Sequence, residues 1–361
     1  MKKTGTEEHI PKIKSGFIKT MKEKYFMCEE ESEKLVENFI KVIEDASDYL
    51  FSLNHSQAYS YIGYVCGYLR YYYPLEFLSV MLNINDGNID KTTNILEYMS
   101  KENIRLNNPK FRYSKAEYYM DKESNSIFKG IGSIKYLNKD IGDYLYSLRN
   151  KEYKSFIELL IDVKGVLNSR QLNILIELDY FSEFGKSQKL IDIVNIYNTI
   201  YTKNQFKKDN LPCDIDIMRK YASVETEKMF KDVNKKELCE YLETIIENID
   251  LPINQRVKSW IENTGSCNIK DATVSNKKAI VIDINTKYKT PKIKLYNLVS
   301  GRTADVKIGA KTWREEKLEL FDTIDIIRIG TKYKKKKIED KWIETDEKEY
   351  WLENYAICKN I

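Results

Sequence analysis

The sequence predicts an α+β fold that is mostly helical over its first two-thirds and ends in a small five-stranded β-barrel. Up to about residue 268, apolar residues recur every three or four positions, which is the spacing of amphipathic helices. After about residue 275, apolar and polar residues alternate, as is typical of strands. The 361 residues are enough for two or three domains, and we divide the chain at 1–105, 106–202, 203–274 and 275–361.

The first segment, 1–105, is predicted to be helical. Residues 32–51 and 92–104 carry apolar positions at helical spacing. A further helix is predicted from about residue 55, with Tyr59, Ile62 and Leu69 on one face. It should end at Pro74, because proline cannot continue a helix interior.

Residues 106–202 are predicted to form short helices broken by turns, and 203–274 a charged, mostly helical connector. The clearest helix of the connector spans 225–249 and would bury Met229 and Phe230. Before it, Asp214 and Asp216 stand two positions apart, a spacing that binds a metal when it falls on a strand. Pro212 and the helix that follows favour loop or helix-capping roles for these two acids instead.

The last segment, 275–361, has five alternating stretches: 279–288, 292–299, 303–310, 322–333 and 348–357. The dipeptide Ser300-Gly301 predicts a turn between the second and third strands, and 311–321 predicts a short helix after the third. Five strands with a helix after the third is the order of an OB-fold, a small barrel that often binds single strands.

The charge distribution, hydropathy and cysteine content limit which partners and which compartment the sequence predicts. Residues 270–361 hold 21 Lys and Arg against 15 Asp and Glu, so the positive excess lies at the C-terminal end and hints at nucleic acid. No run approaches the roughly 20 apolar residues that span a bilayer, and the N-terminus lacks the apolar core of a signal peptide. The six cysteines are scattered, which argues against zinc or disulfides and favours a reducing cytoplasm.

The barrel segment interleaves lysines and aromatic residues, which is the combination that single-strand binding needs. Alternation places Lys292, Lys294 and Tyr296 on one strand face. The alternative is an amphipathic strand with a solvated polar face, or a charged hairpin tip for the basic run 332–337. The candidate DNA-binding residues in this segment are Lys287, Tyr288, Lys289, Lys292, Lys294, Tyr296, Arg302, Lys307, Tyr333 and Lys334.

Residues 55–77 carry a more specific pattern than periodicity. His55-Ser-x-Ala-Tyr is followed by Tyr-x-x-x-Tyr-Leu-Arg70 and then by Tyr73-Pro-x-Glu-Phe. This stretch resembles the fingers region of bacterial C-family replicative DNA polymerases, the alpha subunit of polymerase III. The resemblance implies a DNA-binding role for Arg70, although the family's lysine in this segment is Leu53 here.

A second stretch continues the resemblance. Residues 128–135, FKGIGSIK, look like the start of the family's tandem helix-hairpin-helix module, and 155–185 resembles its second hairpin. In such modules the N–H groups at helix N-termini hold a DNA phosphate. Tyr136 and the residues after it replace the glycines of one family hairpin. The resemblance implies DNA-binding roles for Lys129, Gly130, Gly132, Lys135, Asn168 and Arg170.

The resemblance also implies what the chain would need. The family's phosphoesterase-like domain, thumb and palm would all precede Met1, and the palm aspartates bind the catalytic magnesium. We therefore expect no cofactor in this chain and no activity from the chain alone. Magnesium would come only with a separate polypeptide that bears the palm and phosphoesterase domains, as in a split polymerase.

Two further interpretations stay open. A polymerase fragment without its palm would also act as a decoy or interaction protein that binds DNA or replisome partners. The family's clamp-binding peptide has a weak counterpart at 226–230, which keeps the apolar end, Met229 and Phe230, but lacks the glutamine. A sliding clamp is therefore a weak candidate partner, and no membrane partner is expected.

Overall fold

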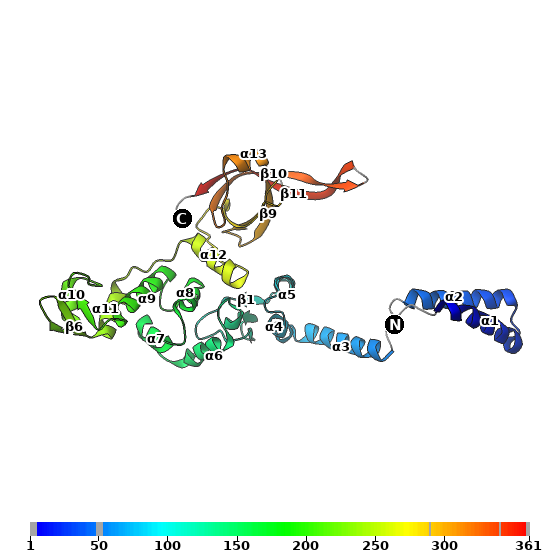
Figure 1. Cartoon of the computed structure of the whole chain (residues 1–361), viewed down its shortest axis with the longest axis horizontal. Helices are drawn as coiled ribbons and strands as arrows, with labels where there is room; N and C mark the ends of the chain where they lie inside the picture. Colours follow the sequence, from blue (N-terminus) through cyan, green and yellow to red (C-terminus); the bar gives the residue numbers. More distant parts are fainter. Residues whose placement is uncertain (1–5, 48–52, 289, 339–340, 359–361) are drawn as a thin grey trace. The chain divides into compact units, whose positions relative to one another are not determined.

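The structure is a computed structural model that describes residues 6–47, 53–288, 290–338 and 341–358. The chain divides into two compact units, Met1–Pro74 and Leu75–Ile361, and each is described by itself (Figure 1). The α+β class, with helices first and a five-stranded barrel last, is confirmed. The division into four segments stays a prediction.

In its described residues the first unit has three helices: α1 (Thr6–Tyr25), α2 (Glu29–Ser47) and α3 (Leu53–Tyr72). An ion pair of 3.1 Å between Lys14 and Glu37 joins α1 to α2, and Val36 and Ile40 of α2 are buried. Helix α3 ends before Pro74, as predicted, and its side chains from residue 56 onward are exposed. The side chain of His55 and residues 48–52 lie outside the described part of the chain.

The second unit begins with helices α4 (Pro74–Ile84) and α5 (Ile89–Lys101) packed on a small sheet. The sheet has the order β1 (Arg105–Asn107), β3 (Ser126–Phe128), β2 (Tyr119–Asp121). Leu78, Leu82 and Met99 from the helices are buried together with Ile127 of β3. Proline at the first position of α4 is favourable because its missing N–H would have no helical partner there.

A larger helical core follows, and it contains most of the buried apolar side chains of the second unit. Phe156, Leu175, Phe181 and Trp260 are among its fully buried members. The elements are the 3₁₀ turn η1 (Ile131–Ser133), α6 (Lys139–Ser147), η2 (Leu148–Asn150), α7 (Phe156–Val163), α8 (Ser169–Glu177), α9 (Ser187–Tyr201), α11 (Lys235–Ile245) and α12 (Ile253–Thr264). The short helices predicted for this region are therefore present.

The predicted helix over 225–249 is wrong in its first half, because a second small sheet occupies that position. The sheet has the order β4 (Gln205–Lys207), β6 (Met229–Val233), β5 (Ala222–Glu225), and α10 (Ile215–Tyr221) precedes β5. Phe230 is fully buried as a strand residue opposite Phe206, not as a helix residue. The helical spacing of the sequence was real, but pairing with β4, some 25 residues earlier, decided the conformation.

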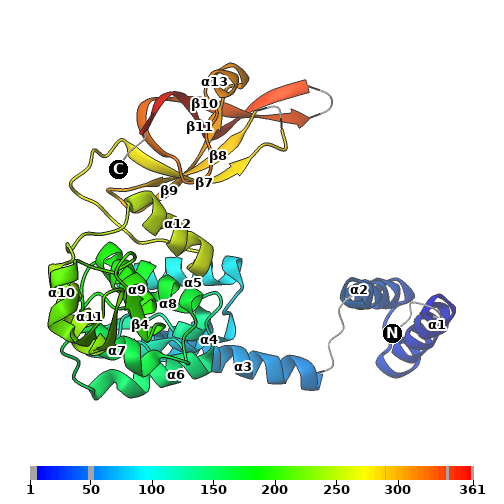
Figure 2. The same ribbon diagram turned by 60° about the vertical axis from the view of Figure 1, so that its left-hand side comes forward.

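The last five strands are β7 (Lys278–Asn285), β8 (Lys292–Asn297), β9 (Thr303–Ile308), β10 (Thr323–Ile338) and β11 (Lys341–Cys358). They close into a barrel in the order β10-β11-β9-β8-β7, with α13 (Ala310–Glu315) after the third strand, as predicted. Gly301 turns the chain between β8 and β9 at φ +67°. Beyond the barrel, β10 and β11 continue as a two-stranded arm (Figures 1 and 2).

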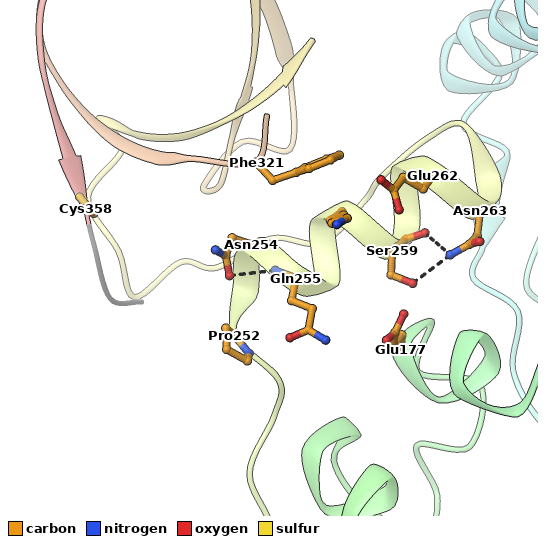
Figure 3. A pocket seen from close by; sticks show the side chains of 10 residues that line it. Glu177, Pro252, Asn254, Gln255, Ser259, Glu262, Asn263, Phe321 and Cys358 are labelled. Carbon is orange, nitrogen blue, oxygen red and sulfur yellow. Dashed lines mark hydrogen bonds between the residues drawn. The ribbon is translucent and has the colours of Figure 1, made fainter. Parts of the chain in front are cut away.

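Helix α12 and the segment after it join the barrel to the helical core. The Lys129 amine donates to the carbonyl of Thr264 at 3.1 Å, and the Tyr296 hydroxyl of β8 donates to the carbonyl of Ile269 at 2.6 Å. A hollow of about 1000 Å³ runs along α12 from Glu177 of α8 to Phe321 and Cys358 of the barrel (Figure 3). Its lining has two acids and Lys258, so it offers no cationic surface to DNA.

Lys129 gives a prediction about stability and pH. Burial lowers the pKa of its amine to about 8, against the opposing effect of the Asp86 carboxylate. The pKa of this amine is thus about 8 in the folded protein and 10.5 in the unfolded chain. Between pH 8 and pH 10.5 the unfolded chain therefore binds more protons than the folded one. The wild type should therefore gain up to about 3 kcal/mol relative to Lys129→Met as pH rises from 8 to 10.5.

Urea unfolding of both proteins at pH 7, 8, 9 and 10 measures this gain. The control for loss of a lysine is Lys311→Met, at a position whose side chain is 89% exposed. Parallel stability curves for the wild type and Lys129→Met across this range would contradict the prediction.

Candidate nucleic-acid interface

Two helix N-termini face a common hollow in the helical core. Asn138 caps α6 and accepts from the N–H of Ile141 at 2.9 Å, and Asn168 caps α8 and accepts from the N–H of Gln171 at 3.0 Å. Both caps and the turn before Asn168 line a hollow of about 590 Å³, and so does the acid Asp140 in the first turn of α6. The positive ends of two helix dipoles and their first N–H groups favour an anion at such a position.

A left-handed residue precedes each cap. Gly165 has φ +87°, which glycine adopts freely, but the equivalent turn before α6 uses Tyr136 at φ +69°. The Arg170 guanidinium lies 3.6 Å from the centre of the Tyr136 ring, and the Gln171 amide donates to the Tyr136 carbonyl at 3.0 Å. The second hairpin therefore holds the tyrosine that replaces glycine in the first.

The roles expected of Gly130 and Gly132 need correction. The N–H of Ile131 donates to the carbonyl of Lys115, and that of Gly132 to the carbonyl of Ala116, both at 2.9 Å. A Cβ on Gly130 would lie 2.5 Å from the carbonyl carbon of Glu117. These glycines permit a close backbone approach inside the protein, and the N–H groups of this turn are already used there.

Lys129 also differs from the expectation, because its side chain is only 6% exposed and its amine is bound to Thr264. In contrast, Lys135 and Arg170 are exposed beside the two hairpins, and Asn168 lies at the hollow itself. Lys164, exposed next to Gly165, was not predicted, although its position before a hairpin glycine was a usable signal. Arg70 is exposed on α3 in the other unit.

A second surface crosses the outer face of the barrel. Register places Lys292 of β8 opposite Lys307 of β9, and Lys307 beside Trp351 of β11. The amine of Lys332, from β10, lies 3.9 Å from the centre of the Trp351 ring. Four neighbouring strands therefore contribute to one row of cations around an indole ring, and we call Lys292, Lys307, Lys332 and Trp351 the tryptophan row.

Carboxylates partly neutralise this row. Lys292 pairs with Asp305 at 2.9 Å and Lys307 with Glu349 at 2.6 Å. Burial opposes ionisation of Glu349, but hydrogen bonds from Lys307 and Trp351 outweigh it and hold its pKa below the ordinary value. Trp351 and Lys332 were not predicted as site residues. The alternation of Glu349 and Trp351 along one strand was visible in the sequence, but the register that brings Lys332 of β10 beside them was not.

Tyr296 corrects the predicted strand face. It does share the outward side of β8 with Lys292 and Lys294, which are exposed, but its ring is only 1% exposed. The segment after α12 covers that end of the strand, and its Ile269 carbonyl accepts a hydrogen bond from the Tyr296 hydroxyl. Tyr296 is thus a packing residue and does not offer a surface for stacking a base.

The remaining predicted residues of the barrel are dispersed. Lys287 and Tyr288 are exposed in the loop between β7 and β8, and Arg302 is exposed in the turn between β8 and β9. Lys289 lies outside the described residues. On the arm, Tyr333 is exposed and Lys334 pairs with Glu347 at 2.5 Å. Lys332 and Lys334 of the basic run therefore lie next to acids of β11, Glu349 by register and Glu347 by an ion pair, which the sequence alone did not indicate.

Two weaker sequence signals also have structural explanations. Asp214 is the N-cap of α10 and accepts from the N–H of Asp216 at 2.8 Å, and Asp216 pairs with Arg219 at the same distance. Phe230 is fully buried, so this side chain is not available to a sliding clamp. In the part of the chain that the structure covers, no helix is long and apolar enough to cross a membrane.

Comparison with known families agrees with the hairpin geometry. Residues 103–191, which contain both capped helix N-termini, match the family model of the helix-hairpin-helix motif. This part of the chain is thus of the helix-hairpin-helix class.

The predicted resemblance to DNA polymerase III subunit alpha is confirmed by relatives of that name. The one from Ureaplasma parvum is 32% identical over 173 residues, covering 47% of this chain and 17% of the relative. The one from Campylobacter jejuni is 29% identical over 159 residues, covering 43% and 13%. The one from Buchnera aphidicola is 24% identical over 188 residues, covering 49% and 16%. The chain therefore spans less than a fifth of the length of these relatives.

The glycine contact gives a second prediction. Gly130→Ala places a methyl group against the backbone of Glu117, so it should destabilise the protein by at least about 1–3 kcal/mol, the usual cost of overpacking. Gly309→Ala is the control, since its nearest neighbour, the Thr312 hydroxyl, would be 3.8 Å away. Chemical unfolding measures both, and equal stability of the two variants would contradict the close-approach role.

Proposed function

We propose that this chain is a DNA-binding part of an enzyme of the DNA polymerase III alpha type. It would contact primer-template duplex and the single-stranded template next to it. The observation that carries the proposal is the pair of helix N-termini capped by Asn138 and Asn168, within the segment that matches the helix-hairpin-helix motif. Similarity to the alpha subunits of three bacteria supports it.

The hairpins would hold the duplex by its backbone. In this proposal a phosphate lies at the hollow between the two caps, where helix N–H groups and dipoles attract it. Lys135, Lys164 and Arg170 are exposed on the segments that lead into or follow the two caps, and they would neutralise neighbouring phosphates. Such contacts position DNA but do not read its sequence.

The barrel, in the manner of an OB-fold, would guide the single strand. The tryptophan row supplies an indole ring for stacking and three lysines for phosphates, and these two features suffice for binding without sequence preference. A base that stacks on Trp351 would displace the amine of Lys332 from the ring toward the strand.

Catalysis would come from elsewhere. We propose that nucleotidyl transfer and its magnesium belong to a palm-bearing polypeptide with a phosphoesterase domain, which would assemble with this chain in the bacterial cytoplasm. A second candidate function is that of a decoy or interaction protein. Helix α3 exposes Tyr59, Tyr61, Tyr64 and Tyr71, the kind of surface that binds a partner, and both the split enzyme and the decoy would use such a surface. Copurification from the native source would distinguish the two, since only the split enzyme requires recovery of a palm polypeptide.

Arg170→Ala tests the hairpin proposal. Loss of one phosphate contact should weaken binding to blunt duplex DNA by roughly three- to tenfold and uniformly across sequences, with the salt slope reduced by about one. Fluorescence anisotropy at two salt concentrations measures both quantities. Arg314→Ala on α13 makes the same change of charge at an exposed position outside the hairpins and should leave duplex affinity unchanged. Equal affinities of wild type and Arg170→Ala at low salt would argue against the hairpins as the duplex surface.

Trp351→Ala tests the barrel proposal. Loss of one stacked base should cost about 1–3 kcal/mol in binding an unstructured single strand, while affinity for blunt duplex stays the same. The control is Tyr61→Ala, because Tyr61 is 71% exposed on α3, outside the barrel. Equal affinities of the wild type and Trp351→Ala for the single strand would contradict the barrel proposal.

A further inference from the structure

A third hollow lies apart from the helix N-termini and from the tryptophan row. It has a volume of about 620 Å³ and is formed by β1, the loop after it, β3 and the segment that follows α12. Asn107, Asn108, Lys110, Tyr113, Phe128 and Asn268 are part of its lining. Flat aromatic rings, side-chain amides and a lysine therefore meet in one recess.

The aromatic part is a stacked pair. The rings of Tyr113 and Phe128 are nearly parallel, at 14°, with centroids 5.7 Å apart. Phe128 is half-buried, but Tyr113 is 53% exposed, so the pair extends a flat apolar surface into the hollow. A planar ring can continue such a stack, because offset stacking is a favourable arrangement of aromatic groups.

The loop that carries Tyr113 is held firmly. Phe111 is fully buried and its N–H donates to the carbonyl of Tyr180 at 2.8 Å. Arg112 adopts φ +73°, and its guanidinium donates to Glu183 at 2.9 Å and to the carbonyl of Arg149 at 2.7 Å. These contacts offset the strain of a left-handed arginine, and they fix the exposed ring before any ligand arrives.

The rim supplies hydrogen-bonding groups. The Asn268 amide donates to the side-chain carbonyl of Asn108 at 2.6 Å. Within the described residues, the amide nitrogen of Asn108 and the carbonyl oxygen of Asn268 have no further protein partner. The pair thus presents a donor beside an acceptor, which is the complement of a nucleobase edge.

Charge in the recess favours a group with a phosphate attached. The amine of Lys110 lies 5.5 Å from the centre of the Tyr113 ring. The carboxylate of Asp179, also in the lining, is held by Arg256 at 2.5 Å. The lysine is therefore the cation that a phosphate would meet at this hollow.

We propose that this hollow binds one unpaired nucleobase of DNA, stacked on Tyr113, with its edge at Asn108 and Asn268 and its phosphate near Lys110. This rests on the proposed function, because DNA held by the hairpins would bring a strand to the recess. The base must be unpaired, since the complementary strand would compete for the edge that the two amides meet. The site would hold the single strand next to a duplex end.

The test uses the full chain and two kinds of DNA: a blunt duplex, and the same duplex with a short single-stranded tail, placed on one strand in one sample and on the other strand in a second. Tyr113→Ala should weaken binding to one tailed duplex by roughly five- to a hundredfold, since one stacked base is lost. It should leave affinity for the blunt duplex unchanged. Tyr113→Phe keeps the ring and should bind like the wild type. Tyr61→Ala is the control, because Tyr61 is 71% exposed on α3 and does not line the hollow.

A second readout is independent of affinity. A fluorescent adenine analogue in the tail should be quenched on binding by the wild type and by Tyr113→Phe, but not by Tyr113→Ala. Asn108→Ala should weaken binding to the tailed duplex, since it removes an amide that meets the base edge, and should leave affinity for the blunt duplex unchanged. Unchanged quenching in Tyr113→Ala, or equal losses in Tyr113→Ala and Tyr61→Ala, would overturn the nucleobase site.

Failure of this proposal is distinguishable from failure of the proposed function. If the wild type binds both DNAs and Tyr113→Ala behaves identically, only the nucleobase site is wrong. If blunt duplex is not bound but the tailed duplex is, and Tyr113 matters, the hairpin proposal fails and this one stands. No binding to either DNA would overturn both.

Discussion

The hairpin module depends on a close contact between two stretches of backbone. Residues 115–118 lie in a slot made by Gly130, Gly132 and Gly142, where a Cβ on Gly142 would be 2.6 Å from the Cα of Ala116. Because no side chains intervene, the N–H groups of η1 reach the carbonyls of the facing stretch. Tyr113 directly precedes residues 115–118, and the Asn138 cap lies a few residues after Gly132. One backbone contact therefore positions both the nucleobase hollow and the first helix N-terminus.

Two non-glycine residues in left-handed turns support the candidate surfaces. Tyr136 at φ +69° is stabilised by Arg170 over its ring, and Arg112 at φ +73° by its bonds to Glu183 and two backbone carbonyls. Such conformations cost of order 1–3 kcal/mol and persist only where neighbours offset them. In both cases the result is an aromatic ring held at the surface next to a cation.

The cations of the two proposed DNA surfaces differ in what already neutralises them. Lysines of the barrel are paired with carboxylates, as Lys292 is with Asp305 and Lys307 with Glu349. Surface ion pairs of this kind contribute little to stability. When a DNA phosphate replaces the carboxylate as the partner of such a lysine, the net change in binding free energy is therefore small. At the hairpins the positive potential comes from helix ends, which are fixed by the fold. We therefore expect the hairpins to supply electrostatic affinity and the barrel to supply stacking.

Local patterns in the sequence determined the fold class and the five strands with a helix after the third, because these depend on periodicity within a few residues. They also determined that a helix stops before Pro74, because proline geometry acts locally. Asn168 was also predictable, since a cap acts on N–H groups of its own turn. Burial by distant segments and pairing between them could not be predicted from the sequence. Tyr296 is covered by a segment about 27 residues away, Lys129 binds a carbonyl 135 residues away, and β6 pairs with β4 instead of extending α11. The tryptophan row and the Tyr113 hollow exist only because tertiary structure brings separate strands and loops together, and no local pattern carries the register that does so.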